Sequence, residues 1–353
     1  MSEIFTQEQR AFIAQNLIDG VDQLSQAGVE QHHLFAIIDA SRNPNVISTV
    51  LQAMTDECEC LYRGQARENH ADSSPWLVKI GSNTSTLDWI MEEVYGTRGC
   101  IFFTSSNSLD WNANHFRKFI KVKNSAGELI FFRFFDPLLF NGFVDVFSRQ
   151  QREAFFDGIG TVYAEFSRFV LVANRLTDEG QLERLTIVAP DWDGRDEPPS
   201  PSQFQPVPLP QIDMSGSSVR PYLTFSQAQL EAPYLRNPVL MIDSVVNYLF
   251  DYFPDSRNLF TLSHMQIMAE AALIKARHYK IFTEAEICAF AALMWRFSPN
   301  FDDVPALKKV LVLPAPAEER LEILYTRTPQ RYWNAAERGR DEEHWVRIIE
   351  EAA

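Results

Sequence analysis

The sequence predicts an α/β N-terminal domain with a mixed sheet and flanking helices, followed by a Pro-rich linker and an all-α C-terminal domain. Short apolar runs of strand length alternate with amphipathic helical patterns in the first half, whereas the last third contains helical patterns only. Between Pro190 and Pro221, further prolines are mixed with Ser, Gln, Asp and Gly, a composition that excludes a regular helix or a central strand. We therefore divide the chain into residues 1–189, 190–221 and 222–353.

The elements of the first domain follow from periodicity and capping patterns. A leading helix over roughly residues 6–26 begins with the capping-box spacing of Thr6 and Gln9. Five apolar runs have the length and composition of strands: residues 34–39, 76–80, 100–104, 129–134 and 184–189. Three further segments have helical periodicity: residues 45–54, 85–95 and 109–120.

Three helix starts in the last part of the chain share one pattern. Ser226, Ser263 and Thr283 each precede a Gln or Glu by three residues, and apolar neighbours fit a hydrophobic staple. After the third start, five apolar residues follow helical spacing and predict one buried face: Ile287, Phe290, Ala291, Met294 and Phe297.

Composition and charge exclude several classes of function. The 353 residues carry a net charge of -15, which argues against nucleic-acid binding and against attraction to anionic membranes. The first residues lack the basic and apolar regions of a signal peptide, and no apolar run reaches the ~18 residues of a membrane helix. The cysteines do not have zinc-site spacing: Cys58, Cys60, Cys100 and Cys288. We expect a cytoplasmic protein with no metal, no cofactor and no stable membrane insertion.

No motif for phosphate, dinucleotide, zinc-protease or serine-hydrolase chemistry is present. The scattered polar candidates for chemistry are His32, His33, Asp39, Asp110, His115 and Asp136. A metal-dependent or acid/base hydrolase built on Asp39, His115 and Asp136 is the alternative to a binding protein, and it requires these side chains to converge.

Each of these candidates also has a structural interpretation, which we favour. Asp39 ends a strand-like run, where a carboxylate can serve catalysis, or can begin a turn or cap the helix that follows. Adjacent histidines on an extended chain point in opposite directions and chelate one metal poorly. His115 lies one helical turn from Trp111 and Phe119, which is typical of a hydrogen-bonded, half-buried histidine.

The segment "ELIFFRFFDPLLF" places charges inside a strongly apolar stretch. If residues 129–135 form a strand, both of its faces are apolar and it is covered on each side. Asp136 and Pro137 have the pattern of a helix start, with Asp as the N-cap and Pro in the first turn. The apolar face of that helix would comprise Leu139, Phe143, Val146 and Phe147.

Arg133 requires a partner if it is buried, because losing one member of a buried ion pair costs ~3–5 kcal/mol. Asp39 and Asp136 are the candidate partners, and the sequence does not choose between them. We expect Arg133, together with Arg117, to act as an internal clamp.

Five segments in order resemble a known family: "HLFAIIDASRNP", "SPWLVKI", "DWIMEEVYGTRGCIFFTS", "HFRKFIKVKNSAGELIFFRFFDPLLF" and "SRQQREAFFDGI". The succession is similar to the type VI secretion effector chaperone (adaptor) domain and covers roughly residues 33–160. Two positions depart from the family pattern: Phe135 replaces the usual Tyr, and Tyr95 replaces the Trp of a Trp-Gly pair. The residues that carry the family motifs are Asp39, Pro75 to Val78, Trp89, His115, Arg117, Phe132, Arg133, Asp136 and Pro137.

The resemblance implies an adaptor and not an enzyme. Members of this family hold a cognate toxic effector in the producing cell and help to load it onto the spike protein of the secretion needle. A variable C-terminal region is thought to carry effector specificity, which suits the predicted helical domain. We therefore expect two protein partners, the effector and the spike, and favour residues 226–297 for partner binding. Some of the 27 Phe and 7 Trp could line the binding groove.

Overall fold

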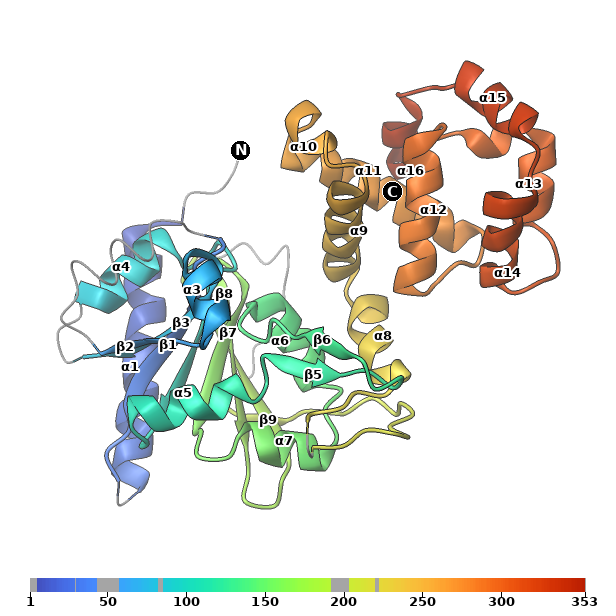
Figure 1. The fold of residues 1–353 in the computed structure, drawn as a ribbon. Helices are drawn as coiled ribbons and strands as arrows, with labels where there is room; N and C mark the ends of the chain where they lie inside the picture. The colour runs from blue at the N-terminus through green and yellow to red at the C-terminus, as the bar shows by residue number, and fades with distance from the viewer. Residues whose placement is uncertain are drawn as a thin grey trace. The chain divides into compact units, whose positions relative to one another are not determined.

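The computed structural model describes residues 5–28, 30–42, 57–81, 85–191, 203–219 and 222–352. Two compact units make up the chain, Met1–Leu230 and Glu231–Ala353, and each is considered by itself (Figure 1). The predicted Pro-rich linker, residues 190–221, thus falls within the range of the first unit. The boundary between the units lies after the linker, between Leu230 and Glu231.

The first unit is built on an eight-stranded sheet of order β10-β9-β8-β7-β4-β1-β3-β2. Its strands are β1 (His33–Asp39), β2 (Cys58–Cys60), β3 (Pro75–Ile80), β4 (Cys100–Ser105), β7 (Thr161–Ser167), β8 (Val170–Leu176), β9 (Leu182–Val188) and β10 (Gln205–Pro206). This α/β unit and the helical unit after it confirm the predicted fold class. The prediction of a mixed sheet is wrong in one respect, because every pairing among the described strands is antiparallel. The reason is visible at β7 and β8: only two residues join these strands, and parallel strands need a long crossover.

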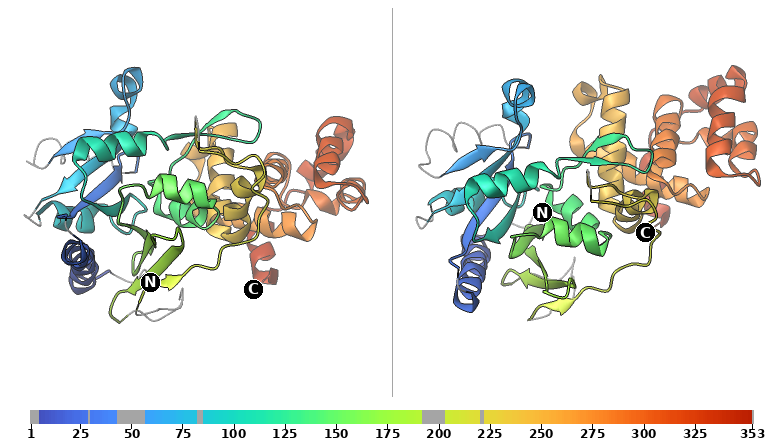
Figure 2. Two further views of the ribbon diagram at one scale, coloured as in Figure 1. Left: turned by 90° about the horizontal axis from the view of Figure 1, so that it is seen from below. Right: turned by 60° about the horizontal axis from the view of Figure 1, so that its bottom comes forward.

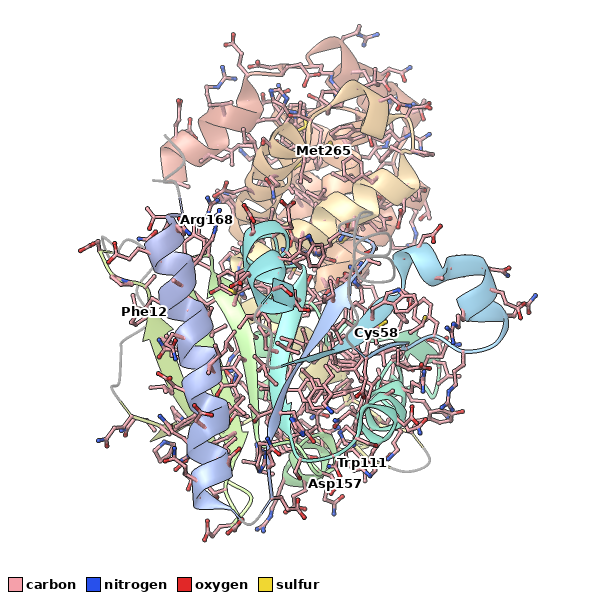
Figure 3. The ribbon with its side chains drawn as sticks, turned by 90° about the vertical axis from the view of Figure 1, so that its left-hand side faces the viewer. Phe12, Cys58, Trp111, Asp157, Arg168 and Met265 are labelled. Carbon is pink, nitrogen blue, oxygen red and sulfur yellow. The ribbon has the colours of Figure 1, made fainter. Side chains whose placement is uncertain are left out.

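Helices cover both faces of this sheet. The helices of the unit are α1 (Gln7–Ala27), α3 (Gln65–His70), α4 (Ser85–Glu93), α5 (Leu109–Arg117), α6 (Pro137–Val144) and α7 (Arg149–Phe155), with the 3-10 turn η1 (Ala71–Ser73). Figure 3 shows α1, which carries Phe12, and α5, which carries Trp111, on opposite sides of the sheet. Side chains alternate along β1: Ala36 and Ile38 join the core under α1 and α4. Phe35 lies on the other face and stacks on Phe103, with ring centroids 5.1 Å apart.

The predicted elements of the first unit are largely confirmed. The Thr6–Gln9 capping box is present at the start of α1, and β1, β3, β4 and β9 coincide with four of the five predicted strands. Helices α4 and α5 coincide with two of the predicted helices, whereas residues 45–54 lie outside the described residues. The sequence did not indicate β7 and β8, whose alternation of apolar and polar residues is weak.

The predicted strand at 129–134 is shorter and more exposed than expected. Strand β6 (Leu129–Phe131) pairs only with β5 (Lys121–Lys123), in a separate two-stranded sheet. Leu129 is 51% exposed and Phe131 is 46% exposed, so the strand is not covered on both faces. The chain leaves the ladder after Phe131 and turns toward α6, where Asp136 donates its amide to the carbonyl of Arg133. The buried phenylalanines of this stretch belong to that turn: Phe132, Phe134 and Phe135.

Helix α6 begins as predicted, with Asp136 as its N-cap and Pro137 in the first turn. Its apolar face differs from the predicted one, because the helix ends at Val144 and Leu139 is half-exposed. The buried residues of the helix are Pro137, Leu138, Phe140, Phe143 and Val144.

The rest of the chain is helical. Its helices are α8 (Gln227–Arg236), which crosses the boundary, α9 (Pro238–Tyr252), α10 (Ser256–Leu259), α11 (Leu262–His278), α12 (Glu284–Arg296), α13 (Pro305–Leu311), α14 (Ala317–Glu322), α15 (Gln330–Arg338) and α16 (His344–Ala352), with the short turns η2 (Phe301–Asp303) and η3 (Ile323–Arg327). Helices α9, α11 and α12 lie against one another and form the centre of the second unit (Figure 2).

Two of the three predicted helix caps are confirmed. Ser226 and Gln229 exchange reciprocal bonds at the start of α8, and Thr283 with Glu286 forms a capping box at α12. The prediction of Ser263 as a cap is wrong: α11 begins at Leu262, and Thr261 accepts the amide of His264. The apolar face predicted after Thr283 is buried in the core of the second unit. Among the described residues, no helix combines the length and the apolar character that crossing a bilayer requires.

Candidate functional site

Asp39 and Arg133 form an ion pair at the end of β1. The Asp39 carboxylate is buried, and the Arg133 guanidinium donates to it. Asp39 also accepts the amide of Ser41 at 3.0 Å and the Ser41 hydroxyl at 2.7 Å. Asp39 is therefore the partner carboxylate of Arg133. Arg133 is thus paired as predicted, but its side chain is 37% exposed, and Arg117 is not part of this pair.

Asp136 has a helix-capping role and two arginine partners. Its carboxylate accepts the amide of Leu138 at 3.0 Å, which satisfies a free donor in the first turn of α6. Arg98 approaches the same carboxylate at 2.9 Å, and Arg42 approaches it at 2.7 Å. Asp136 thus fixes the start of α6 and draws together two segments that are distant in sequence.

Arg42 links the two carboxylates into one cluster. Its Nε lies 3.9 Å from Asp39 Oδ2, while its terminal nitrogen contacts Asp136. We call the resulting group the arginine–carboxylate cluster; its members are Asp39, Arg42, Arg98, Arg133 and Asp136. The cluster holds three guanidinium groups around two buried carboxylates whose oxygens accept several hydrogen bonds. Carboxylates engaged in this way are suited to holding segments together rather than to moving a proton.

Glu165 supports this cluster from β7. Its buried carboxylate accepts the amide of Gly96 at 2.6 Å and also the amide of Arg98. Gly96 and Arg98 both have positive φ, so Glu165 holds a tight turn that directs Arg98 toward Asp136. Burial raises the pKa of the Glu165 carboxyl to about 7, against the two amide donors, which lower it.

Sequence reasoning missed Arg42, Arg98 and Glu165. Glu165 is the only charged residue between Gly158 and Ser167, and a lone carboxylate in an apolar run was a usable signal. Arg42 follows Asp39 by three residues, but nothing in the sequence shows which direction its side chain takes.

His115 lies apart from the arginine–carboxylate cluster. Its Nε2 donates to the carbonyl of Phe155 at 2.8 Å, and its ring stacks on Trp111 with centroids 5.0 Å apart. Burial lowers the pKa of His115 to about 4. The histidine that the hydrolase alternative requires therefore has its own buried environment, with no described contact to Asp39 or Asp136.

The remaining candidate residues have separate environments. Arg117 contacts Glu59 and the carbonyl of Cys60, each at 2.6 Å, and so ties α5 to β2. Trp89 of α4 packs against the core on the α1 side of the sheet. Asp110 is exposed in the first turn of α5.

His32 and His33 lie beside a small pocket between α1 and the sheet, where Asp22 is the only carboxylate among the lining residues. Burial and the nearby Lys79 lower the pKa of His33. Within the described part of the chain, no three His, Cys, Asp or Glu side chains are placed to hold a metal ion.

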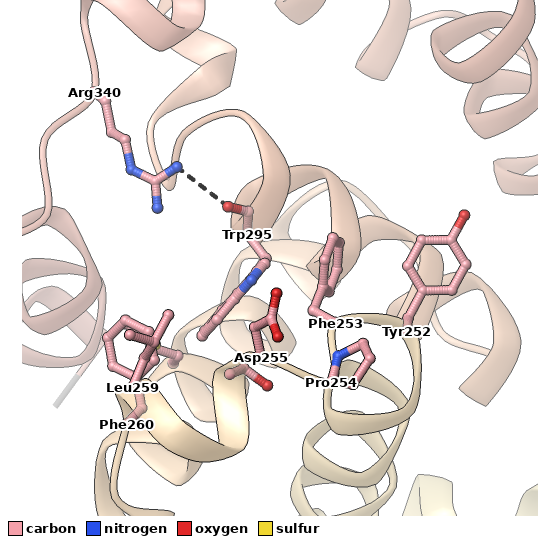
Figure 4. A pocket seen from close by; sticks show the side chains of 10 residues that line it. Tyr252, Phe253, Pro254, Asp255, Leu259, Phe260, Trp295 and Arg340 are labelled. Atoms are coloured by element: carbon pink, nitrogen blue, oxygen red, sulfur yellow. Dashed lines mark hydrogen bonds between the residues drawn. The ribbon is translucent and has the colours of Figure 1, made fainter.

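The second unit contains a candidate partner-binding pocket with a volume of about 470 Å³ (Figure 4). We call it the aromatic pocket; it is lined by Tyr252, Phe253, Pro254, Asp255, Ser256, Leu259, Phe260, Met268, Trp295 and Arg340. Most of these residues fall in the range favoured from the sequence for partner binding, 226–297.

Ring contacts and a hydrogen bond hold the wall residues of the aromatic pocket in position. The Trp295 ring lies between Phe253 and Phe260, with centroid distances of 6.2 and 5.1 Å. Arg340 donates to the Trp295 carbonyl at 3.2 Å, the bond drawn in Figure 4. Leu259 is 73% exposed and Tyr252 is 57% exposed at the edge of the pocket. An apolar pocket with exposed apolar rims is suited to receive a hydrophobic side chain of a partner.

Comparison with known proteins identifies one family, and only for part of the chain. No curated protein and no solved structure matches the sequence. Residues 34–154, about a third of the chain, match the model of a family described as a domain of unknown function, DUF4123. The matched segment contains every member of the arginine–carboxylate cluster, from Asp39 to Asp136, and it ends before Glu165.

Proposed function

We propose that this protein is a cytoplasmic adaptor that binds a cognate type VI secretion effector and promotes its loading onto the spike protein. The proposal rests mainly on one observation: the motif resemblance and the family match cover nearly the same residues. The ordered motifs that resemble the effector chaperone domain occupy roughly residues 33–160, and the family match occupies residues 34–154.

The roles of the motif residues support a binding scaffold. Asp39, Arg133 and Asp136 hold the end of β1 against the start of α6. His115 anchors α5 to the end of α7 through the Phe155 carbonyl. Motif residues whose side chains are engaged in ion pairs, caps and backbone bonds account for a family signature without requiring catalysis.

The aromatic pocket gives the helical unit a means of gripping cargo. Its exposed rim residues, Leu259 and Tyr252, offer apolar area that a partner can bury. Burying such anchors in a preformed pocket is the usual source of affinity at protein interfaces. On this proposal the first unit is the common adaptor part and the second unit distinguishes effectors.

Co-purification tests the proposal. The full chain, expressed with the product of the neighbouring gene and with the spike protein, is expected to recover both. Recovery of neither from a well-expressed culture would contradict the adaptor function.

Two matched substitutions test the assignment of the pocket. Leu259→Asp places a charge at the rim of the aromatic pocket and is expected to reduce effector recovery. Val312→Asp makes the same change at another exposed apolar residue, outside this pocket, and is expected to leave recovery unchanged. Equal recovery by both variants would remove the pocket from the proposal and leave the adaptor function standing.

A further inference from the structure

The hydrogen-bond pattern of the β5–β6 sheet leaves one edge of β6 open. Phe132 donates to the Ile120 carbonyl, and Asn124 donates to the Glu128 carbonyl. Because the bonded pairs of an antiparallel ladder alternate, Ile130 is the residue of β6 whose backbone groups face β5. The amides and carbonyls of Leu129 and Phe131 consequently point away from β5. No described residue forms a backbone ladder with this side of β6.

The far edge of β5 is occupied, in contrast to that of β6. Lys123 donates its amide to the Leu223 carbonyl at 2.8 Å, and Phe225 donates to the Lys123 carbonyl at 2.9 Å. A segment of the chain thus already lies alongside β5. Among the described residues, β6 alone presents a free edge in this small sheet.

The outer face of the same sheet is both apolar and basic. Register places Lys121 opposite Phe131 and Lys123 opposite Leu129, so these four side chains share one face. The other face is turned toward the core, where Val122 is fully buried. Two tyrosines border the outer face: Tyr62 packs edge-on against Phe131, and Tyr222 lies 5.3 Å from the Lys123 ammonium.

The charges on this face are uncompensated within the described part of the chain. Neither Lys121 nor Lys123 forms an ion pair there, although the protein as a whole carries a net charge of -15. Residues 118–123 contain three lysines and no acidic residue, whereas the preceding Arg117 is already paired with Glu59. A local excess of positive charge on a strongly acidic protein selects a partner segment of negative charge.

We propose that the open edge of β6 binds an extended, acidic segment of the cargo protein as an added strand. The Leu129 and Phe131 backbone groups would supply the ladder, the two lysines would contact acidic side chains, and Phe131 with Tyr62 would contact apolar ones. The proposal rests on the adaptor function and adds a second contact to that function, independent of the aromatic pocket.

Charge distinguishes this occupant from others. A second copy of the chain, paired edge to edge through β6, would add two more lysines to the positive charge near this edge, whereas an acidic segment would neutralise that charge. Nucleic acid is disfavoured because the surrounding protein is acidic and would repel phosphates. An acidic polypeptide would both pair with the free backbone groups of β6 and neutralise the charges of the two lysines.

Substitution at Leu129 separates strand addition from simple side-chain contact. Leu129→Pro removes the outward amide and leaves the Val122–Ile130 pairing with β5 in place, because proline is tolerated at an exposed edge. Leu129→Ala removes the side chain and keeps the amide. With the purified effector as the probe, Leu129→Pro is expected to raise Kd by about tenfold, and Leu129→Ala by about twofold or threefold. Equal effects of the two variants would overturn strand addition.

Amide hydrogen exchange gives a readout that does not depend on substitution. Binding of the effector is expected to slow exchange at the amides of Leu129 and Phe131, which face outward in the free protein. The amide of Ile130 already pairs with Val122 and serves as the internal control. Unchanged exchange at both outward amides in a saturated complex would overturn the proposal.

The charge requirement has its own test. Lys121→Glu is expected to weaken effector binding by about tenfold at low salt and by less at high salt, since screening reduces the contribution of exposed charges. Lys309→Glu makes the same change at an exposed lysine of α13 and is expected to have no effect. Failure of the wild-type chain to bind the effector would refute the adaptor function, whereas wild-type binding unchanged in the Leu129 and Lys121 variants would refute only this inference.

Discussion

Arg133 donates a hydrogen bond to the buried carboxylate of Asp39, which precedes it by 94 residues. The pair joins the end of β1, an inner strand of the sheet, to the turn that leads into α6. Arg42 then connects Asp39 to Asp136, the cap of that helix. The position of Arg133 inside a phenylalanine-rich segment is thus explained by a contact that holds the turn before α6 against the end of β1.

The two members of this pair are expected to respond unequally to substitution. Asp39→Asn removes a buried charge and one of the two oxygens that accept from Arg133 and Ser41, while Arg42 keeps Asp136; we expect a loss of roughly 3 kcal/mol in the free energy of unfolding. Arg133→Gln removes a guanidinium that is more than a third exposed, and Arg42 remains near Asp39, so we expect a loss of only about 1 kcal/mol. Urea denaturation of the full chain measures both.

An exposed pair supplies the control for this comparison. Arg149→Gln breaks the surface bridge to Glu153 within α7, which is expected to cost less than ~0.5 kcal/mol. If Asp39→Asn were no more destabilising than Arg149→Gln, the assignment of Asp39 as a buried structural carboxylate would be wrong.

Asp136 combines a helix cap with ion pairs, and two substitutions separate these contributions. Asp136→Ser retains an oxygen that can accept an amide of the first turn of α6 but removes the charge. Asp136→Ala removes both. We expect the alanine variant to be less stable than the serine variant by ~0.5–2 kcal/mol, the usual contribution of a cap.

The loss common to both Asp136 variants reports on Arg42 and Arg98, which would be left without this partner. Thermal or urea unfolding measures both the loss common to the two variants and the difference in stability between them. Equal stabilities of Asp136→Ser and Asp136→Ala would mean that the cap bond to Leu138 contributes nothing measurable.

Local signals in the sequence predicted much of the fold because they act over three or four residues. The capping boxes at Thr6 and Thr283, and the Asp136 and Pro137 start of α6, depend only on neighbouring backbone groups. Ser263 failed as a cap because Thr261, two residues earlier, offers the same chemistry. A local pattern cannot decide between two adequate caps.

The site was less predictable because its residues meet through tertiary contacts. Composition alone gave β6 two apolar faces, but the chain leaves the ladder at Phe131 and turns three phenylalanines into the core. Arg98 reaches Asp136 through a turn that Glu165 holds from a different strand. The sequence indicates that Arg133 needs a carboxylate, and only the contact between the end of β1 and the turn before α6 shows that Asp39 supplies it.

Gly158 is expected to tolerate no side chain. Its φ is 68°, and an added Cβ would lie 2.5 Å from Asn107 Nδ2 and 2.6 Å from the Trp111 ring. Gly158→Ala therefore combines backbone strain with a clash, and we expect a loss of about 2–4 kcal/mol. Gly127→Ala is the matched control, because its φ is 84° but an added Cβ meets no atom within 4 Å.

The difference between these two glycine variants isolates the clash from the strain. Gly127→Ala is expected to cost about 1–2 kcal/mol through backbone strain alone. Comparable losses for the two variants, measured by urea unfolding, would show that the Trp111 side chain can move away from the new methyl group.

His115 is expected to make stability depend on pH. Its pKa is lowered to about 4 by burial, while an unfolded histidine has its ordinary value of 6.5. Between pH 6.5 and pH 4 the unfolded chain therefore takes up a proton at this position that the folded protein does not. The contribution of His115 to stability is fully present above pH 6.5 and is lost as the pH falls, by about 3 kcal/mol in total.

The geometry gives the reason for the sign. Nε2 already donates to Phe155, and Nδ1 is buried with no hydrogen-bond partner, so a second proton would have no acceptor. His115→Gln cannot titrate, and the difference in unfolding free energy between wild type and this variant should fall as the pH is lowered from 6.5 to 4. Measuring the His115 ring by NMR across the same range tests the pKa directly. A difference that stays constant with pH, or a ring that titrates near 6.5, would mean that water reaches Nδ1 and that the packing of α5 against α7 is looser than the contacts around His115 indicate.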